Sequence, residues 1–184
     1  MRILTGKYKG RLIHMPRGIR PTQDKVRKAL FDILGDMDDV SFLELFAGSG
    51  AIGFEALSRG AKELTLVEYN RDCQLAIRRN IDSLKAVSCE VHPALADKAI
   101  RLFHKDSRQF DVIFLDPPYY QDLSKKTLHT LETCDILAPN GFIVVQHFKK
   151  DDLPETLGVF SLFKRKIYGD TVLSFYQQAS QKDI

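Results

Sequence analysis

The chain has 184 residues, with 27 Lys and Arg against 24 Asp and Glu, so its formal net charge is +3. A hydrophobic fraction of 44% and a charged fraction of 28% exclude a disordered chain and favour one globular domain with a small extension. The longest strongly apolar runs have four residues, against the roughly 18 that cross a bilayer, so we expect no membrane span and no secretory leader.

The basic residues are concentrated at the N-terminal end. Residues 1–30 hold nine Lys or Arg and one acid, a net charge of +8, while the rest of the chain carries −5. A basic arm on an acidic body favours a polyanionic partner, with a solvated charged edge as the alternative. We predict phosphate contacts from Arg2, Lys7, Lys9, Arg11, Arg17 and Arg20, extended onto the following helix by Arg27 and Lys28.

The first predicted element is a small β-hairpin in this arm. Short apolar runs at 3–4 and 12–15 flank a connection rich in turn residues, and Pro16, Gly18 and Pro21 then interrupt regular structure. A helix follows, with Thr22 as its N-cap and Gly35 just beyond its end. We therefore expect an N-terminal extension over 1–22, a core domain over 23–178 and a frayed tail over 179–184.

From residue 41 the pattern alternates between strands and helices. Strands are predicted at 42–46, 64–67, 87–91, 110–115 and 142–147, and helices at 51–58, 71–84 (with Asn70 as its cap), 94–103 and 124–134. Such alternation predicts a mostly parallel α/β sheet covered on both faces. Two β-rich segments at 160–168 and 171–178, joined by Gly169-Asp170, predict an antiparallel hairpin at the C-terminal end.

A glycine loop follows the first core strand. Gly48-Ser49-Gly50-Ala51-Ile52-Gly53 fits G-x-G-x-x-G between a predicted strand and a predicted helix. Glu68 lies twenty residues after Gly48, at the end of the second strand, where a carboxylate can accept both hydroxyls of a ribose. The combination indicates a nucleoside-containing cofactor, with a tight turn and an unrelated acid as the alternative.

Glu44 narrows the choice of cofactor. It lies inside the apolar first strand, where an acid costs desolvation unless a cation compensates it. The ammonium of S-adenosylmethionine is such a partner, whereas the pyrophosphate of a nicotinamide dinucleotide would be repelled. The alternative is a salt bridge to a protein Lys or Arg.

The tetrapeptide Asp116-Pro117-Pro118-Tyr119 directly follows the fourth strand. Ligand sites in open α/β sheets lie at this end of the strands. The Asp116 carboxylate and the Pro117 carbonyl could accept both hydrogens of one exocyclic amine, and Tyr119 offers a flat face on which an extruded base can stack. A structural turn with a buried tyrosine is the alternative.

With these motifs the sequence resembles the bacterial methyltransferases that modify the exocyclic N2 of one guanine in 16S ribosomal RNA. Matching blocks run from Met1-Arg2-Ile3 through Arg20-Pro21-Thr22 and the two motifs above to Tyr168-Gly169-Asp170-Thr171. The resemblance implies a Rossmann-like S-adenosylmethionine-dependent methyltransferase with a seven-stranded sheet. It also implies a cytoplasmic protein, here expected as a monomer without a metal, acting on 16S rRNA within the small ribosomal subunit or its assembly intermediate.

The resemblance also assigns residues to roles. Glu44, Gly48, Ser49 and Gly50 would hold the methionine end of the cofactor, Glu68 the ribose and Tyr69 the adenine, and Asp116, Pro117 and Tyr119 would handle the target base. Members often carry Asp or Asn after the third strand, near the adenine amine. Here that segment contains Ala94, so adenine contact falls to backbone groups there or to His92.

Other readings stay open at the level of sequence. The chain could methylate another nucleic-acid amine, such as adenine N6 in DNA or in another rRNA. It could also be a catalytically inactive RNA-binding assembly module. A nicotinamide-dependent oxidoreductase leaves the Asp-Pro-Pro-Tyr tetrapeptide unexplained.

Overall fold

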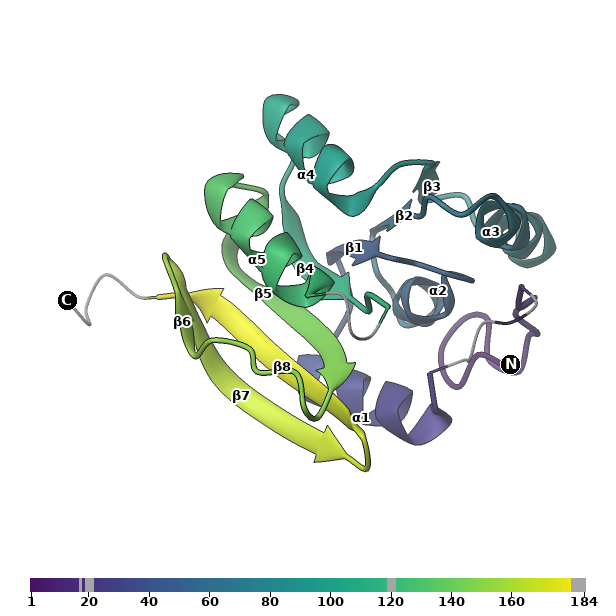
Figure 1. Ribbon diagram of the computed structural model, residues 1–184. Helices are drawn as coiled ribbons and strands as arrows, with labels where there is room; N and C mark the ends of the chain where they lie inside the picture. Colours follow the sequence, from purple (N-terminus) through teal and green to yellow (C-terminus); the bar gives the residue numbers. More distant parts are fainter. Residues whose placement is uncertain (17, 19–21, 119–121, 180–184) are drawn as a thin grey trace. The chain divides into compact units, whose positions relative to one another are not determined.

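The computed structural model describes residues 1–16, 18, 22–118 and 122–179 (Figure 1). The chain divides into two compact units, Met1–Ala96 and Asp97–Ile184. In the described ranges, no helix is both long enough and apolar enough to cross a bilayer.

The first unit holds a parallel sheet with the strand order β3-β2-β1. Its elements, in chain order, are α1 (Asp24–Leu34), β1 (Ser41–Leu45), α2 (Ala51–Ser58), β2 (Glu63–Val67), α3 (Arg71–Leu84) and β3 (Cys89–His92). Every residue of β1 and of α2 is buried, which explains why both read as nearly continuous apolar runs. The strands therefore form the interior of the unit.

Helix packing in the first unit depends on small and aromatic side chains. A Cβ at Gly53 would lie 2.5 Å from Leu64 Cδ1, so glycine lets α2 approach the sheet closely. On α1, the ring of Phe31 stacks on that of Phe42 in β1, with centroids 6.5 Å apart. The apolar spacing of both helices is thus used to cover the strands.

The predicted N-terminal hairpin is reduced to one antiparallel bridge, between Arg2 and Leu12. The reason is that α2 binds the donors that a longer ladder would need. Leu4 N donates to Glu55 Oε2 at 2.8 Å, and Lys7 N donates to Ser58 O at 2.7 Å. The arm is thereby fixed to a helix of its own unit through its main chain.

The second unit holds a mixed sheet with the strand order β4-β5-β8-β7-β6. Its elements are α4 (Ala96–Lys105, which begins at the boundary), β4 (Phe110–Leu115), α5 (Leu123–Thr133), β5 (Leu137–Phe148), β6 (Thr156–Leu157), β7 (Phe160–Tyr168) and β8 (Thr171–Gln178). β4 and β5 are parallel, and the remaining pairs are antiparallel. The α/β class, with its mostly parallel strands and its C-terminal hairpin, is confirmed.

Several local predictions need correction. β5 begins five residues early, because the Pro139-Asn140-Gly141 segment lies in an irregularity of the strand, where Phe110 pairs with Leu137 but Val112 with Phe142. The two-residue β6 adds an eighth strand, among described residues, to the seven expected. Thr22 is not the cap of α1, whose cap position is Gln23, without a side-chain bond.

The Asn70 cap is confirmed. Its side chain accepts hydrogen bonds from Asp72 N and Cys73 N, at 2.9 and 3.2 Å. The cap fixes where α3 begins, directly after the end of β2 and the residues that follow it.

Docking of the arm on α2 gives a first prediction. A Cβ at Gly6 would lie 1.7 Å from Ser58 O, and Gly6 has a φ of +81°. We expect Gly6→Ala to release the arm from α2, with faster amide exchange at Lys7 and a loss of several kcal/mol in the free energy of unfolding. The control is Gly10→Ala, where φ is +79° but nothing lies within 4 Å of the added Cβ. It should cost only about 1–2 kcal/mol. Equal losses for both variants would contradict the proposed docking.

Candidate active site

The glycine loop makes a tight connection from β1 to α2. Gly48 and Gly50 have φ values of +56° and +74°, and Gly50 N donates to Ala47 O at 2.7 Å. A Cβ at Gly50 would lie 2.8 Å from the Phe54 ring. The loop therefore excludes a side chain at position 50 and brings main chain to the start of α2, and helix N-termini in general favour polar or anionic ligands.

Glu68 holds this loop from the end of β2. It is 7% exposed, and its two carboxylate oxygens accept hydrogen bonds from Gly48 N and Asn70 N, each at 2.8 Å. A carboxylate has about four acceptor positions, so two remain for the hydroxyls of a ribose. In the structure Glu68 thus fixes the glycine loop to the end of β2.

The Glu44 carboxylate accepts a main-chain hydrogen bond that the sequence analysis did not anticipate. It is 4% exposed in β1, and its Oε2 accepts a hydrogen bond from Gly53 N at 2.8 Å. A main-chain donor near the start of α2 thus offsets part of the desolvation that sequence reasoning assigned to a cationic ligand. Only glycine at position 53 leaves room for this contact, since a Cβ there would lie 2.8 Å from Glu44 Oε2.

Three further predicted cofactor residues lie in the same unit. Ser49 is buried, whereas Tyr69 is 62% exposed directly after Glu68. Ala94 N donates to His92 O at 2.9 Å, in a tight turn after β3. The Ala94 amide is therefore used within this turn.

Asn80 is a residue that sequence reasoning missed. It is fully buried on α3, and its Nδ2 donates to Ser49 O at 3.0 Å and to His14 O at 3.1 Å, while its Oδ1 accepts from His14 N at 2.7 Å. One amide therefore joins the glycine loop to the basic arm. The available signal was an Asn among the apolar positions of a helix, where a buried amide requires partners.

Asp116 lies in the second unit, directly after β4. Its Oδ2 accepts a hydrogen bond from Gln146 Nε2 of β5 at 2.8 Å. Burial raises the pKa of Asp116 to about 7, although the bond from Gln146 acts to lower it. The carboxyl group can therefore both accept hydrogen bonds and exchange a proton near neutral pH. Gln146 had no motif that marked it in the sequence.

The rest of the tetrapeptide is described in part. Pro117 is buried and Pro118 is exposed, while Tyr119 lies outside the described residues. Proline at both positions removes two N–H donors, so the described part of the turn offers only acceptors to a ligand.

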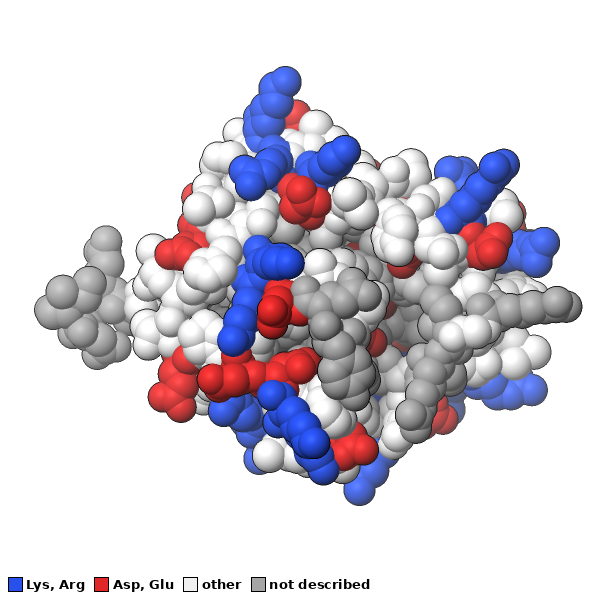
Figure 2. All heavy atoms as spheres, viewed as in Figure 1, with Lys and Arg blue, Asp and Glu red and all other residues white. Residues whose placement is uncertain are grey.

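The basic arm is exposed at its charged side chains. Lys7 and Lys9 are exposed, Arg2 donates to Gly10 O at 2.7 Å, and Arg11 donates to Ser83 O at the end of α3. Arg17 and Arg20 lie outside the described residues. Figure 2 shows Lys and Arg interspersed with Asp and Glu over the visible face.

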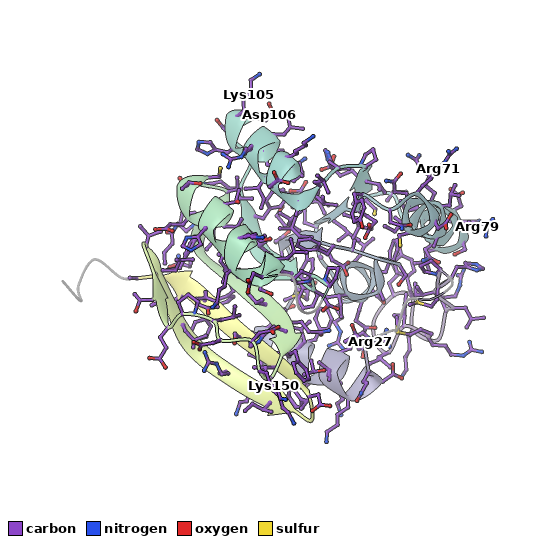
Figure 3. The ribbon with its side chains drawn as sticks, viewed as in Figure 1. Arg27, Arg71, Arg79, Lys105, Asp106 and Lys150 are labelled. Carbon is purple, nitrogen blue, oxygen red and sulfur yellow. The ribbon has the colours of Figure 1, made fainter. Side chains whose placement is uncertain are left out.

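Arg27 does not extend this basic surface, contrary to the sequence-based expectation. It is fully buried, its Nη2 lies 3.0 Å from Asp24 Oδ1 and donates to Arg2 O, and its Nε lies 3.8 Å from Glu55 Oε2. Figure 3 shows Arg27 at α1, whereas Arg71 and Arg79 extend outward from α3. Arg27 therefore fixes the arm from within and is not available to phosphate.

Comparison with known proteins places this geometry in a family. The family model described as "Conserved hypothetical protein 95" matches residues 1–177. Ribosomal RNA small subunit methyltransferase D of Escherichia coli (strain K12) is 34% identical over 184 residues, which cover 98% of this chain and 91% of that protein. The chain therefore belongs to the family that this model describes.

Solved structures agree with the family assignment. The Escherichia coli protein yhhF is 34% identical, with a TM-score of 0.86, and the match covers 98% of this chain and 99% of that one. SMU.776, solved in complex with SAH, is only 16% identical, with a TM-score of 0.65 over 86% of this chain and 50% of that one, so it shows the fold alone. The Rossmann-like methyltransferase fold and the predicted family resemblance are thereby confirmed.

The raised pKa of Asp116 predicts a pH-dependent stability in this family member. Because the folded-state pKa of about 7 exceeds the usual 3.8, the folded chain keeps a proton that the unfolded chain releases. The contribution of Asp116 to the free energy of unfolding should therefore fall as pH rises toward 7. We expect the wild type to lose about 2–3 kcal/mol relative to Asp116→Asn between pH 5 and pH 8, measured by urea unfolding. A pH-independent difference would contradict the raised pKa of this carboxyl.

Proposed function

We propose that this chain transfers a methyl group from S-adenosylmethionine to the exocyclic N2 of a guanine in 16S rRNA of the small ribosomal subunit. The observation that carries the proposal is the partly buried Asp116 carboxyl at the end of β4, bound by Gln146 and followed by a turn that offers only acceptors. Such a group suits an amine. The relatives named as small-subunit rRNA methyltransferases support RNA as the molecule that carries this amine.

The first unit supplies residues that fit the cofactor. Glu68 keeps two acceptor positions for the ribose, and the left-handed Gly48 and Gly50 bring main chain to the start of α2 for the methionine end. Tyr69, exposed beside Glu68, would cover the adenine. The cofactor supplies a methyl group on a positively charged sulfur, which leaves as a neutral thioether.

The second unit supplies residues that fit the target amine. The Asp116 carboxylate and the Pro117 carbonyl would each accept one amine hydrogen and so leave the nitrogen lone pair free to attack the methyl group. The nitrogen–carbon bond forms as the carbon–sulfur bond breaks, and the positive charge moves to nitrogen. The nitrogen then loses a proton, which a carboxylate with a pKa of about 7 can accept. Tyr119 is proposed from the sequence as the stacking partner of the base.

Recognition of the RNA is assigned to the arm. Lys7, Lys9 and Arg11 are exposed on a segment whose main chain is fixed to α2 and α3. A surface held in place before binding loses less conformational entropy when it meets phosphate than a disordered tail would lose. Arg2, Arg17 and Arg20 complete the proposed set.

A methyl-transfer assay with labelled donor tests the proposed function. Unmethylated small-subunit particles, naked 16S rRNA and duplex DNA would be compared, and the modified nucleotide mapped by mass spectrometry. We expect N2-methylguanine at one position of the 16S rRNA. Label on adenine, or on DNA alone, would overturn the guanine assignment, and absence of label would favour an assembly module.

The role of Asp116 can be separated from donor binding. We expect Asp116→Ala to reduce kcat by at least 100-fold, because the amine loses its acceptor. The affinity for S-adenosylhomocysteine, measured by calorimetry, should stay within about threefold of the wild type. A fully active variant would show that the tetrapeptide has another role.

The arm can be tested through the salt dependence of binding. We expect replacement of Lys7, Lys9 and Arg11 by Ala to lower the slope of log affinity against log salt by about 2–3, because each phosphate contact contributes about 0.7–0.9. The control removes Lys98, Arg101 and Lys105, three exposed cations of α4 (Lys105 is labelled in Figure 3). An unchanged slope in the arm variant, or equal changes in both, would assign the arm a structural role.

A further inference from the structure

One oxygen in the second unit is buried without a hydrogen bond. Gln146 is 5% exposed, and its Oε1 has no partner among the described residues, while its Nε2 donates to Asp116. The other buried side-chain atoms in this condition both belong to Arg27, whose charge has ion-pair partners in Glu55 and Asp24. A neutral acceptor left in this way is costly and requires an explanation.

The fold places this oxygen beside the proposed amine site. β4 and β5 are parallel with Leu115 opposite Val145, so Asp116 and Gln146 follow as the next positions in register. With Asp116 ionised, as the proposed amine contact requires, turning the amide over would bring Oε1 against a carboxylate oxygen, so the carboxylate fixes the amide orientation. Oε1 and Nε2 share one carbon, so the unpaired oxygen lies next to the bond between Nε2 and Asp116.

We propose that Gln146 Oε1 accepts the N1–H of the target guanine, while Asp116 and Pro117 accept its N2 amine. This inference rests on the proposed function and gives a reason for its choice of base. It makes Gln146 a specificity-determining residue that also positions Asp116.

The number of donors on each base supports the assignment. Guanine presents three hydrogens along this edge, two on N2 and one on N1, to match the Asp116 carboxylate, the Pro117 carbonyl and Gln146 Oε1. Adenine presents two hydrogens on N6 but a lone pair at N1, and cytosine presents two on N4 but a lone pair at N3. Either base would place a lone pair against Oε1. A site with a buried acceptor discriminates strongly against a base that cannot donate to it.

The same contact connects recognition with reactivity. The hydrogen bond from Gln146 lowers the pKa of Asp116 and so favours the carboxylate form that accepts the amine. Oε1 is closed to solvent, so a base must displace the groups that cover it. The hydrogen bond from guanine N1 to this oxygen offsets the free-energy cost of that displacement, whereas a base with a lone pair at this position forms no such bond.

The test compares guanine with 2-aminopurine at the mapped target position of reconstituted small-subunit particles. Both bases carry the 2-amino group, but 2-aminopurine has no hydrogen on N1 and no oxygen on C6, so the Gln146 variant decides which difference is read. We expect the wild type to prefer guanine by at least tenfold in kcat/KM. Gln146→Met removes both the acceptor and the hydrogen bond to Asp116 at similar volume, so turnover should fall on both bases while the preference between them drops to within about threefold and S-adenosylhomocysteine affinity is kept. Gln178→Met, the same change at an exposed position of β8, should keep the wild-type preference.

The outcomes separate this inference from the proposed function. A wild-type preference near one, or an undiminished preference in Gln146→Met, would overturn the role of Gln146 while leaving guanine methylation intact. Failure of the wild type to methylate either particle would overturn the proposed function itself. If Gln146→Met does not fold, Gln146→Asn serves in its place, because the shorter amide cannot keep both contacts.

Discussion

The first unit depends on buried glutamates that bind main-chain amides. Glu44 accepts from Gly53 in α2, Glu68 from Gly48 and Asn70, and Glu55 from Leu4 and Thr5 in the arm. Each carboxylate replaces the water it loses on burial with N–H donors that the backbone must satisfy in any case. The strand end, the glycine loop, the first turns of α2 and the arm are therefore held by one kind of contact.

Much of the architecture followed from the sequence because local signals and burial agree. The apolar runs of β1 and β4, the glycine loop between a strand and a helix, and the Asn70 cap each correspond to one local conformation. The C-terminal hairpin was equally clear, because Gly169 adopts a φ of +64° between two β-rich segments. The positions of Glu44, Glu68 and Asp116 at the ends or interiors of strands followed from the same reasoning.

The remainder depends on contacts between distant positions, which no local pattern encodes. The arm reads as a hairpin, but Glu55 and Ser58, some fifty residues away in sequence, take its donors instead. Arg27 reads as a surface cation, but the same Glu55 draws it inside. Gln146 is one polar residue in a strand, and only the register of β4 with β5 brings it to Asp116. Charge counts could not separate cations that meet solvent from those that hold the arm.

Asn80 has a consequence for how such a sequence can drift. Its amide contacts only the main chain of His14 and Ser49, so the side chains at those two positions are not fixed by the bond, whereas position 80 itself must supply two donors and an acceptor. Glu55 and Glu68 likewise accept hydrogen bonds from the main-chain N–H groups of Leu4 and Gly48, so these bonds depend on the glutamate side chains and not on the side chains of the donor residues. Substitutions should therefore be tolerated at arm positions such as 14, but not at Gly6, Gly50 or Gly53, where a Cβ would clash, while a few interior polar residues stay unchanged. The substrate-facing surface can then vary in composition without loss of the frame that supports it.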